Sequence, residues 1–253
     1  MALTEAQKIC KQVNFYFSDS NLPYDKFLWT LRSNSPNGWI PIETIANFKK
    51  MKMITEDLDT VVKALKENES DIYEVDEEGK NIRRKTEVVQ QDHISRSIYI
   101  KGLPLVDVDT EDPIAETFKL QDQVDEFFSE KAKVLCVRLK KTHERPYQLK
   151  GSAYVEFETP EDAQKIADLK EVEMDGHKLE LMYRPKYIEM KSEQFKNAPP
   201  PKKRFRTFNA FYVNNNSNNV NNKRKADNGF AKNGNDKKQK TKNEEVKEKE
   251  ESS

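Results

Sequence analysis

The stretch QVNFYFSDSNLPYDKFLW, from Gln12 to Trp29, places three aromatic residues in a row and follows them with a polar loop that contains a proline. Successive side chains on a helix point about 100° apart, so one buried stripe cannot cover all three rings. The preceding TEAQ (4–7) has the pattern of a capping box that starts a helix. The inward stripe of that helix is predicted to be Ile9, Cys10, Val13 and Phe17. We therefore predict that Tyr16, and partly Phe15, lie off the core face.

The first module is predicted to span residues 3–85 and to be a winged helix, because several helices are followed by a β-hairpin. Its second helix is expected to carry Phe27, Leu28 and Leu31. The predicted elements are, in order, the opening helix, a second helix with Pro23 in its first turn, a strand at 39–42, a short helix holding Ile45, Ala46 and Phe48, a longer helix from about Thr55, and strands at 72–75 and 81–84 joined by a turn at 77–80.

A polar linker, residues 86–95, separates this module from a second one with a different hydrophobic period, residues 96–196. Its order, β-α-β-β-α-β, is that of a four-stranded sheet backed by two helices, so the overall fold class is α+β. The predicted elements are a strand followed by a turn at 96–104, strands at 134–141, 150–158 and 178–183, helices at 113–129 and 159–169, and a terminal helix near 187–196. The inward positions of the first of these helices are predicted to be Ile114, Phe118, Val124 and Phe127.

Charge is distributed unevenly along the 253 residues, although the formal net charge is zero. Residues 195–253 hold 15 Lys and Arg against 7 Asp and Glu, which leaves 29 against 37 in the rest of the chain. Residues 197–253 also lack apolar periodicity, so we predict a disordered, low-complexity basic tail. Cys10 and Cys136 are expected to be buried free thiols. No apolar run approaches a membrane span and the N-terminus does not resemble a secretory signal, so we expect a soluble intracellular protein.

Lys150 to Phe157 (KGSAYVEF) fits seven of the eight positions of the pattern Lys/Arg-Gly-aromatic-Gly/Ala-aromatic-Val-x-aromatic, which marks an RNA-recognition motif. Ser152 stands where the pattern has one stacking ring. In this fold exposed rings stack unpaired bases, so we predict a binding face made of Tyr99 and Tyr154, with Lys101 and Lys150 nearby. The alternative is that these tyrosines are ordinary strand residues.

No general sequence pattern assigns a function to the opening stretch. The chain reads KICKQVNFYFSDSNLPYDKFL, followed by GWIPIETIANF and NIRRK, and in these segments it resembles the La motif of the La family. The RNA-recognition module after it agrees with the domain order of that family, and the resemblance covers roughly residues 6–196. It implies a short, fungal-type La homologue that acts as an RNA chaperone. Such a protein binds the UUU-OH 3′ ends of new RNA polymerase III transcripts, including precursor tRNAs, shields them from exonucleases and assists their maturation.

Matched position by position, the resemblance implies a set of residues for the uridine 3′ end. They are Gln12, Phe15, Tyr16, Asp25, Phe27 and Phe48. Phe15 replaces a tyrosine of the family, so stacking is kept there but a hydroxyl is lost. Val137 corresponds to an aliphatic residue at a strand edge that supports the contact. Phe27 and Phe48 could instead be core residues, and Asp25 could simply complement a helix dipole.

The sequence does not favour an enzyme, because it contains none of the common phosphate-binding, nucleophile or metalloprotease motifs. His93, His143 and His177 have no ligand partner at metal spacing, so we expect no metal and no cofactor, and a solvated His93. Two alternatives stay open: a La-related protein that binds messenger RNA or telomerase RNA, and a winged-helix protein-interaction or DNA-binding module. We expect a nuclear monomer that binds RNA and no membrane, with basic clusters of the tail available to an import receptor.

Overall fold

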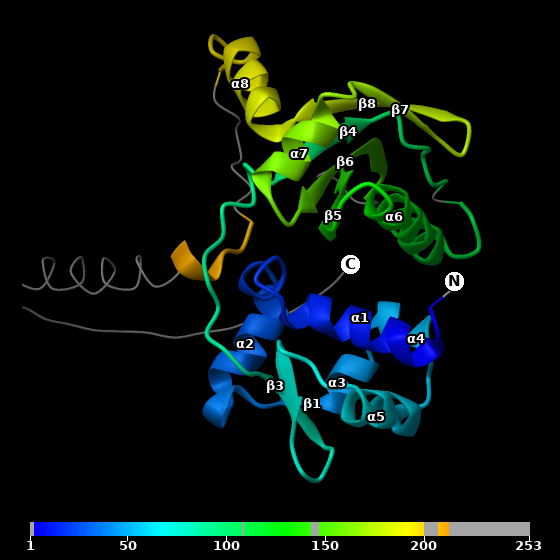
Figure 1. Cartoon of the computed structure of the whole chain (residues 1–253), viewed down its shortest axis with the longest axis vertical. Coiled ribbons are helices and arrows are strands. Elements are labelled where there is room, and N and C mark those ends of the chain that lie inside the picture. The colour runs from blue at the N-terminus through cyan, green and yellow to red at the C-terminus, as the bar shows by residue number, and fades with distance from the viewer. Residues whose placement is uncertain (1–2, 108, 143–146, 200–206, 213–253) are drawn as a thin grey trace, which may run out of the picture. The chain divides into compact units, whose positions relative to one another are not determined.

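The computed structural model describes residues 3–107, 109–142, 147–199 and 207–212 (Figure 1). Two hydrophobic cores lie among these residues, one for each predicted module. Most of the predicted tail lies outside the described residues, but in the stretch 207–212 Ala210 is buried. No helix among the described residues is both long enough and apolar enough to cross a bilayer.

The first module combines short helices with a three-stranded antiparallel sheet in the order β1-β3-β2, as expected for a winged helix. Its core is centred on residues of α1 and α5, which pack against each other. The elements are α1 (Glu5–Phe17), η1 (Leu22–Tyr24), α2 (Lys26–Asn34), η2 (Pro36–Gly38), β1 (Ile40–Pro41), α3 (Ile42–Ala46), α4 (Lys49–Lys52), α5 (Leu58–Glu67), β2 (Tyr73–Val75) and β3 (Asn81–Arg84).

The predicted capping box starts α1, since the Thr4 hydroxyl accepts from the Gln7 amide and the Gln7 side chain accepts from the Thr4 amide. The prediction for Tyr16 is wrong, because Tyr16 is only 8% exposed. Tyr16 belongs to the core of this module, and its ring packs edge-on against Phe48. Cys10, predicted to be buried, is only half-buried, and its thiol donates to the Ala64 carbonyl.

The start of α2 also differs from the prediction. Pro23 belongs to the preceding 3₁₀ turn, and α2 begins at Lys26 with Asp25 as its N-cap. Phe27, in the first turn of this helix, is 55% exposed, whereas Leu28 is fully buried. In the same way α5 begins at Leu58, after the N-cap Asp57, and not near Thr55.

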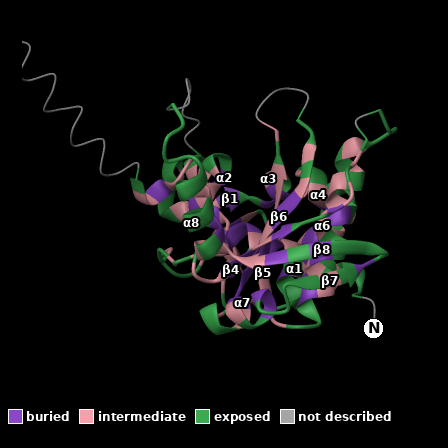
Figure 2. Cartoon of the chain, turned by 90° about the horizontal axis from the view of Figure 1, so that it is seen from above, coloured by how far each residue is buried: buried purple, intermediate pink, exposed green. Residues whose placement is uncertain are grey.

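The second module contains a five-stranded antiparallel sheet in the order β5-β6-β4-β8-β7. Helices α6 and α7 bury their apolar faces against it, and the buried residues appear in purple along its strands in Figure 2. Strand β7, which forms a hairpin with β8, is an addition to the predicted four strands. The elements are β4 (Ser97–Lys101), α6 (Pro113–Ser129), β5 (Val134–Lys141), β6 (Leu149–Phe157), α7 (Pro160–Ala167), β7 (Glu171–Met174), β8 (His177–Tyr183) and α8 (Arg184–Gln194).

Helix α6 has the predicted bounds, and Val124 is buried as predicted, but the other buried residues of its stripe are Leu120 and Phe128, at a spacing of four residues. Ile114, predicted to face inward, is 42% exposed, because it lies in the first turn of the helix, beyond the edge of the sheet core. Phe118 and Phe127 are half-buried. Phe127 packs against the core of this module, as predicted, whereas Phe118 lies outside that core.

Candidate nucleic-acid interface

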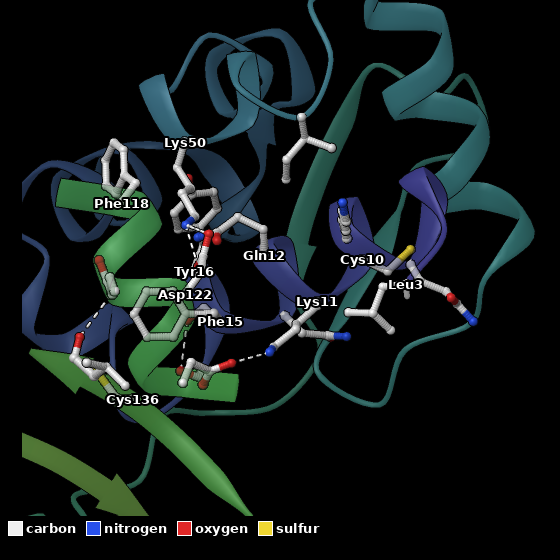
Figure 3. Close-up of a pocket in the computed structure, with 18 of the residues that line it drawn as sticks. Leu3, Cys10, Lys11, Gln12, Phe15, Tyr16, Lys50, Phe118, Asp122 and Cys136 are labelled. Carbon is white, nitrogen blue, oxygen red and sulfur yellow. Dashed lines mark hydrogen bonds and ion pairs between the residues drawn. The ribbon is translucent and has the colours of Figure 1, made fainter. Parts of the chain in front are cut away.

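One cavity of about 1290 Å³ is lined by all six residues that the sequence pattern assigned to the uridine end: Gln12, Phe15, Tyr16, Asp25, Phe27 and Phe48. Val137 of β5 also lines it. Figure 3 shows Gln12, Phe15 and Tyr16 of α1 around this cavity, together with Lys50 of α4 and Phe118 and Asp122 of α6. The fold therefore brings together six side chains, between positions 12 and 48, that resemblance to the La motif could identify only as separate positions in the sequence.

Four aromatic rings form a continuous series along the cavity. Tyr16 lies at the centre, with its ring centroid 6.2 Å from that of Phe15 and 5.1 Å from that of Phe48. Phe48 in turn contacts Phe27 at 5.8 Å, with the planes inclined at 63°. Edge-to-face contacts of this kind hold rings in fixed orientations and leave faces open to a further planar group. Exposed Phe27 and half-buried Phe15 offer such faces.

Gln12 supplies the polar group beside these rings. Its side chain is half-buried and hydrogen-bonds with the Tyr16 hydroxyl. Burial raises the pKa of the Tyr16 phenol well above its ordinary value, although the hydrogen bond from Gln12 acts in the opposite direction. Tyr16 is therefore a neutral hydroxyl near pH 7. An amide has both donors and an acceptor, so Gln12 can pair with a base that presents one of each.

Asp25 has a structural role and retains an unused oxygen. Its Oδ1 accepts from the Phe27 amide at 2.9 Å and from the Leu28 amide at 3.1 Å, which caps α2. Its Oδ2 accepts no hydrogen bond from any described residue, and the side chain lines the cavity. The dipole explanation for Asp25 and a binding role are thus compatible, because each uses a different oxygen.

The cavity also contains charged residues that sequence reasoning missed. Lys50 pairs with Asp122 at 2.5 Å and lies 5.1 Å from the centre of the Phe118 ring. Lys11 pairs with Asp125. Both acids belong to α6, more than 70 residues away in the chain from either lysine. No local pattern could have revealed these pairs, because each depends on the tertiary structure.

The predicted face of the second module is present but partly covered. Tyr99 of β4 and Tyr154 of β6 are opposite each other in the sheet, with ring centroids 5.9 Å apart. Tyr187 of α8 stacks on Tyr99 at 3.9 Å with the planes inclined at 19°. The Lys140 ammonium lies 5.1 Å from the centres of all three rings and donates to the Tyr187 hydroxyl. Tyr187 therefore takes the position on Tyr99 that a stacked base would need.

The other predicted residues of this face differ in their surroundings. Lys150 is exposed, while Lys101 pairs with Glu180 at 3.4 Å across the sheet. Val137 is 5% exposed on the edge strand β5. Gly151 has φ +61°, and a Cβ there would lie 2.9 Å from the Leu103 carbonyl oxygen, so the motif glycine serves a close approach between backbones.

No cluster of His, Cys, Asp and Glu suited to a metal ion occurs within the described parts of the chain. His93 is not a solvated loop histidine as predicted. It is half-buried, and its Nδ1 lies 3.2 Å from the Tyr24 hydroxyl. Burial, together with the nearby Arg184, lowers the pKa of His93, which favours the neutral imidazole.

Comparison with known protein families gives two matches: residues 9–67 match the La domain, and residues 119–180 match the RNA recognition motif. The chain is 30% identical over 197 residues to Lupus La protein homolog B of Xenopus laevis, a match that covers 75% of this chain and 43% of the relative. It is 30% identical over 206 residues to the Lupus La protein homolog of Rattus norvegicus, covering 78% and 46%. The chain thus spans less than half the length of these curated relatives.

Solved structures similar to this chain include the La autoantigen N-terminal domain, at 34% identity and a TM-score of 0.32, covering 35% of this chain and 97% of that one. Another is the La motif of the Dictyostelium discoideum La protein, at 39% identity and a TM-score of 0.30, covering 35% and 96%.

The substitution Tyr187→Ala tests whether the Tyr187 ring blocks base stacking on Tyr99. Removing this ring exposes the face of Tyr99, and stacking on an aromatic ring contributes roughly 1 to 3 kcal/mol per base. We expect the variant to bind an oligoadenylate several-fold more tightly than the unchanged protein, as measured by fluorescence anisotropy at one salt concentration. Ile188→Ala, an exposed position on the same helix, is the control. Unchanged affinity in the Tyr187 variant would contradict a stacking role for Tyr99.

Proposed function

Because this chain belongs to the La family of RNA-binding proteins, we propose that it binds the UUU-OH 3′ ends of new RNA polymerase III transcripts, including precursor tRNAs. Binding there would shield the ends from exonucleases and assist maturation. The protein acts by binding and is not an enzyme. The observation that supports the proposal best is that the six matched residues surround one cavity.

Uracil recognition combines stacking with hydrogen bonding. Phe15, Tyr16, Phe27 and Phe48 provide faces and edges for two or more bases, but stacking alone is tolerant of sequence. Gln12 adds selectivity, because uracil presents an N3-H donor next to carbonyl acceptors and an amide can satisfy both at once. Cytosine lacks this donor at N3, and adenine presents a different edge.

Recognition of the free 3′ end is assigned to Asp25. Its Oδ2 can accept from the 2′ and 3′ hydroxyls of a terminal ribose, while Oδ1 remains on the helix amides. A terminal phosphate would bring like charge to the carboxylate, and DNA would lack the 2′ donor. The site would thus distinguish a completed RNA end from a phosphorylated end or from DNA.

In the cell we place this protein in the nucleus, as a monomer. Its basic tail, which lies almost wholly outside the described residues, would add contacts to phosphates with little sequence preference and could carry an import signal. The sheet face of the second module would hold neighbouring RNA once Tyr187 has moved from Tyr99.

Gln12→Ala tests base selection. The loss of two hydrogen bonds, each with a net value of about 1 kcal/mol, should weaken binding of an RNA ending in UUU-OH by roughly tenfold or more. Binding of an RNA of equal length ending in AAA-OH should hardly change. Isothermal titration at fixed salt measures both, and Gln164→Ala on α7, away from the cavity, is the control. Equal losses for the two RNAs would exclude base reading by Gln12.

Asp25→Asn separates recognition of the 3′ end from helix capping, because asparagine is as good an N-cap as aspartate. The variant keeps the cap but loses the negative charge and the free acceptor. We expect a smaller preference for UUU-OH over UUU-phosphate, by several-fold, with little change in melting temperature. Asp57→Asn, at the corresponding N-cap of α5, is the matched control. If the Asp25 variant keeps the full preference, another group recognises the hydroxyls.

A further inference from the structure

The La motif of this chain has a second cavity, of about 470 Å³, that includes none of the residues assigned to the uridine end. It lies among the C-terminal part of α2, the η2 turn and the end of β3. We call it the basic groove, because four of its side chains are cationic and one is acidic. Its lining residues are Arg32, Asn37, Gly38, Arg83, Arg84, Lys85, Thr86 and Glu87.

Arg84 anchors this groove and is not free to bind a ligand. Its side chain is 6% exposed, and its guanidinium donates to the Phe17 carbonyl, to the Asp19 carboxylate at 2.8 Å and to the Thr86 carbonyl at 3.0 Å. The end of β3 is thereby tied to the end of α1.

Two arginines of the groove are held against indole rings. The Arg83 guanidinium carbon lies 4.4 Å from the centre of the Trp39 ring, and that of Arg32 lies 5.2 Å from the centre of the Trp29 ring. Stacking of this kind restricts the guanidinium plane while leaving its N–H groups in the plane available. The groove therefore has two oriented cations before any ligand arrives.

The acids that accompany these cations are poorly placed to neutralise them. Arg32 pairs at 3.1 Å with Glu87, whose side chain is 91% exposed, and Arg83 pairs with the partly exposed Glu74. Ion pairs with solvent-exposed carboxylates contribute roughly 0 to 1 kcal/mol, so a phosphate can replace them. Lys85 is exposed and makes no ion pair with any described residue.

We propose that the basic groove binds phosphodiester groups of the same RNA, upstream of the uridine end, an inference that rests on the proposed function. Guanidinium groups match phosphate oxygens with two parallel hydrogen bonds, and the groove offers two such groups with a lysine. Asp25 caps the N-terminus of α2, and Arg32 lies seven residues further on, which at 1.5 Å per residue places them roughly 10 Å apart along the helix axis. A strand whose last nucleotides occupy the cavity at Asp25 can reach the groove within a few nucleotides.

The test uses the full chain and compares a four-nucleotide RNA with a sixteen-nucleotide RNA, both ending in UUU-OH. In the double variant Arg83→Gln with Lys85→Gln, we expect the long RNA to bind on the order of tenfold more weakly at 0.1 M salt, with the short RNA unaffected. Log K falls as log salt rises, and each phosphate contact in single-stranded RNA contributes about 0.7 to the steepness of that line. Because the double variant removes two cations, the line should become shallower by roughly 1.4.

The matched control is Lys63→Gln with Lys80→Gln, which removes the same charge from exposed positions of this module outside the groove. The single variant Lys85→Gln separates a loss of binding from a loss of folding, because it disturbs neither arginine–indole contact. It should make the dependence of log K on log salt shallower by about 0.7. If the long RNA and its salt slope respond as they do in the control, the groove does not bind RNA, and an acidic protein partner becomes the better occupant.

The two proposals fail in different ways. If the uridine assignment is wrong, the unchanged protein shows no preference for UUU-OH on the short RNA, yet the groove variant still loses affinity for long RNAs of any end. If only the groove assignment is wrong, the preference on the short RNA remains.

Discussion

The edge-to-face contact between Tyr16 and Phe48, at 5.1 Å and 89°, is the interaction on which the candidate site depends. It joins α1 to the segment between α3 and α4, and it fixes Phe48 where its ring also meets Phe27. The three consecutive aromatics thereby acquire different roles. Phe17 is in the core, Tyr16 is buried in this contact, and Phe15 remains half-buried at the cavity. Loss of this contact would free Phe48 and Phe27 from their fixed positions at the cavity, while Phe17 would stay buried in the core.

Helix α2 places two kinds of chemistry at its two ends. Asp25, at the N-terminus, offers an acceptor beside the aromatic cavity, and Arg32, near the C-terminus, lies in the basic groove. This distribution of charge also agrees with the helix dipole, which favours an acid at the first turn and a base at the last. One short, rigid element can therefore set the distance between a site that reads the end of an RNA and a site that holds its backbone.

Local signals in the sequence explain which parts of the fold could be predicted. The bounds of α6 and β5 were predicted correctly, because Asp112 and Pro113 mark a helix start and an apolar run marks the strand. Strand β7 was missed although Asp175 and Gly176, both at positive φ, form the kind of turn that joins hairpin strands. Burial of Tyr16 and the cover of Tyr187 over Tyr99 depend on contacts distant in sequence, so periodicity could not reveal them. The six uridine-site residues were found by resemblance, and their grouping around one cavity became visible only in the structure.

The most direct measurement of the central claim is the affinity of the full chain, at one salt concentration, for three short RNAs of equal length that end in UUU-OH, UUU-phosphate and AAA-OH. The account predicts that UUU-OH binds most tightly, because only this end satisfies Gln12, the aromatic series and the free oxygen of Asp25 together. Equal affinity for all three would contradict it and would reduce the cavity to a general stacking surface.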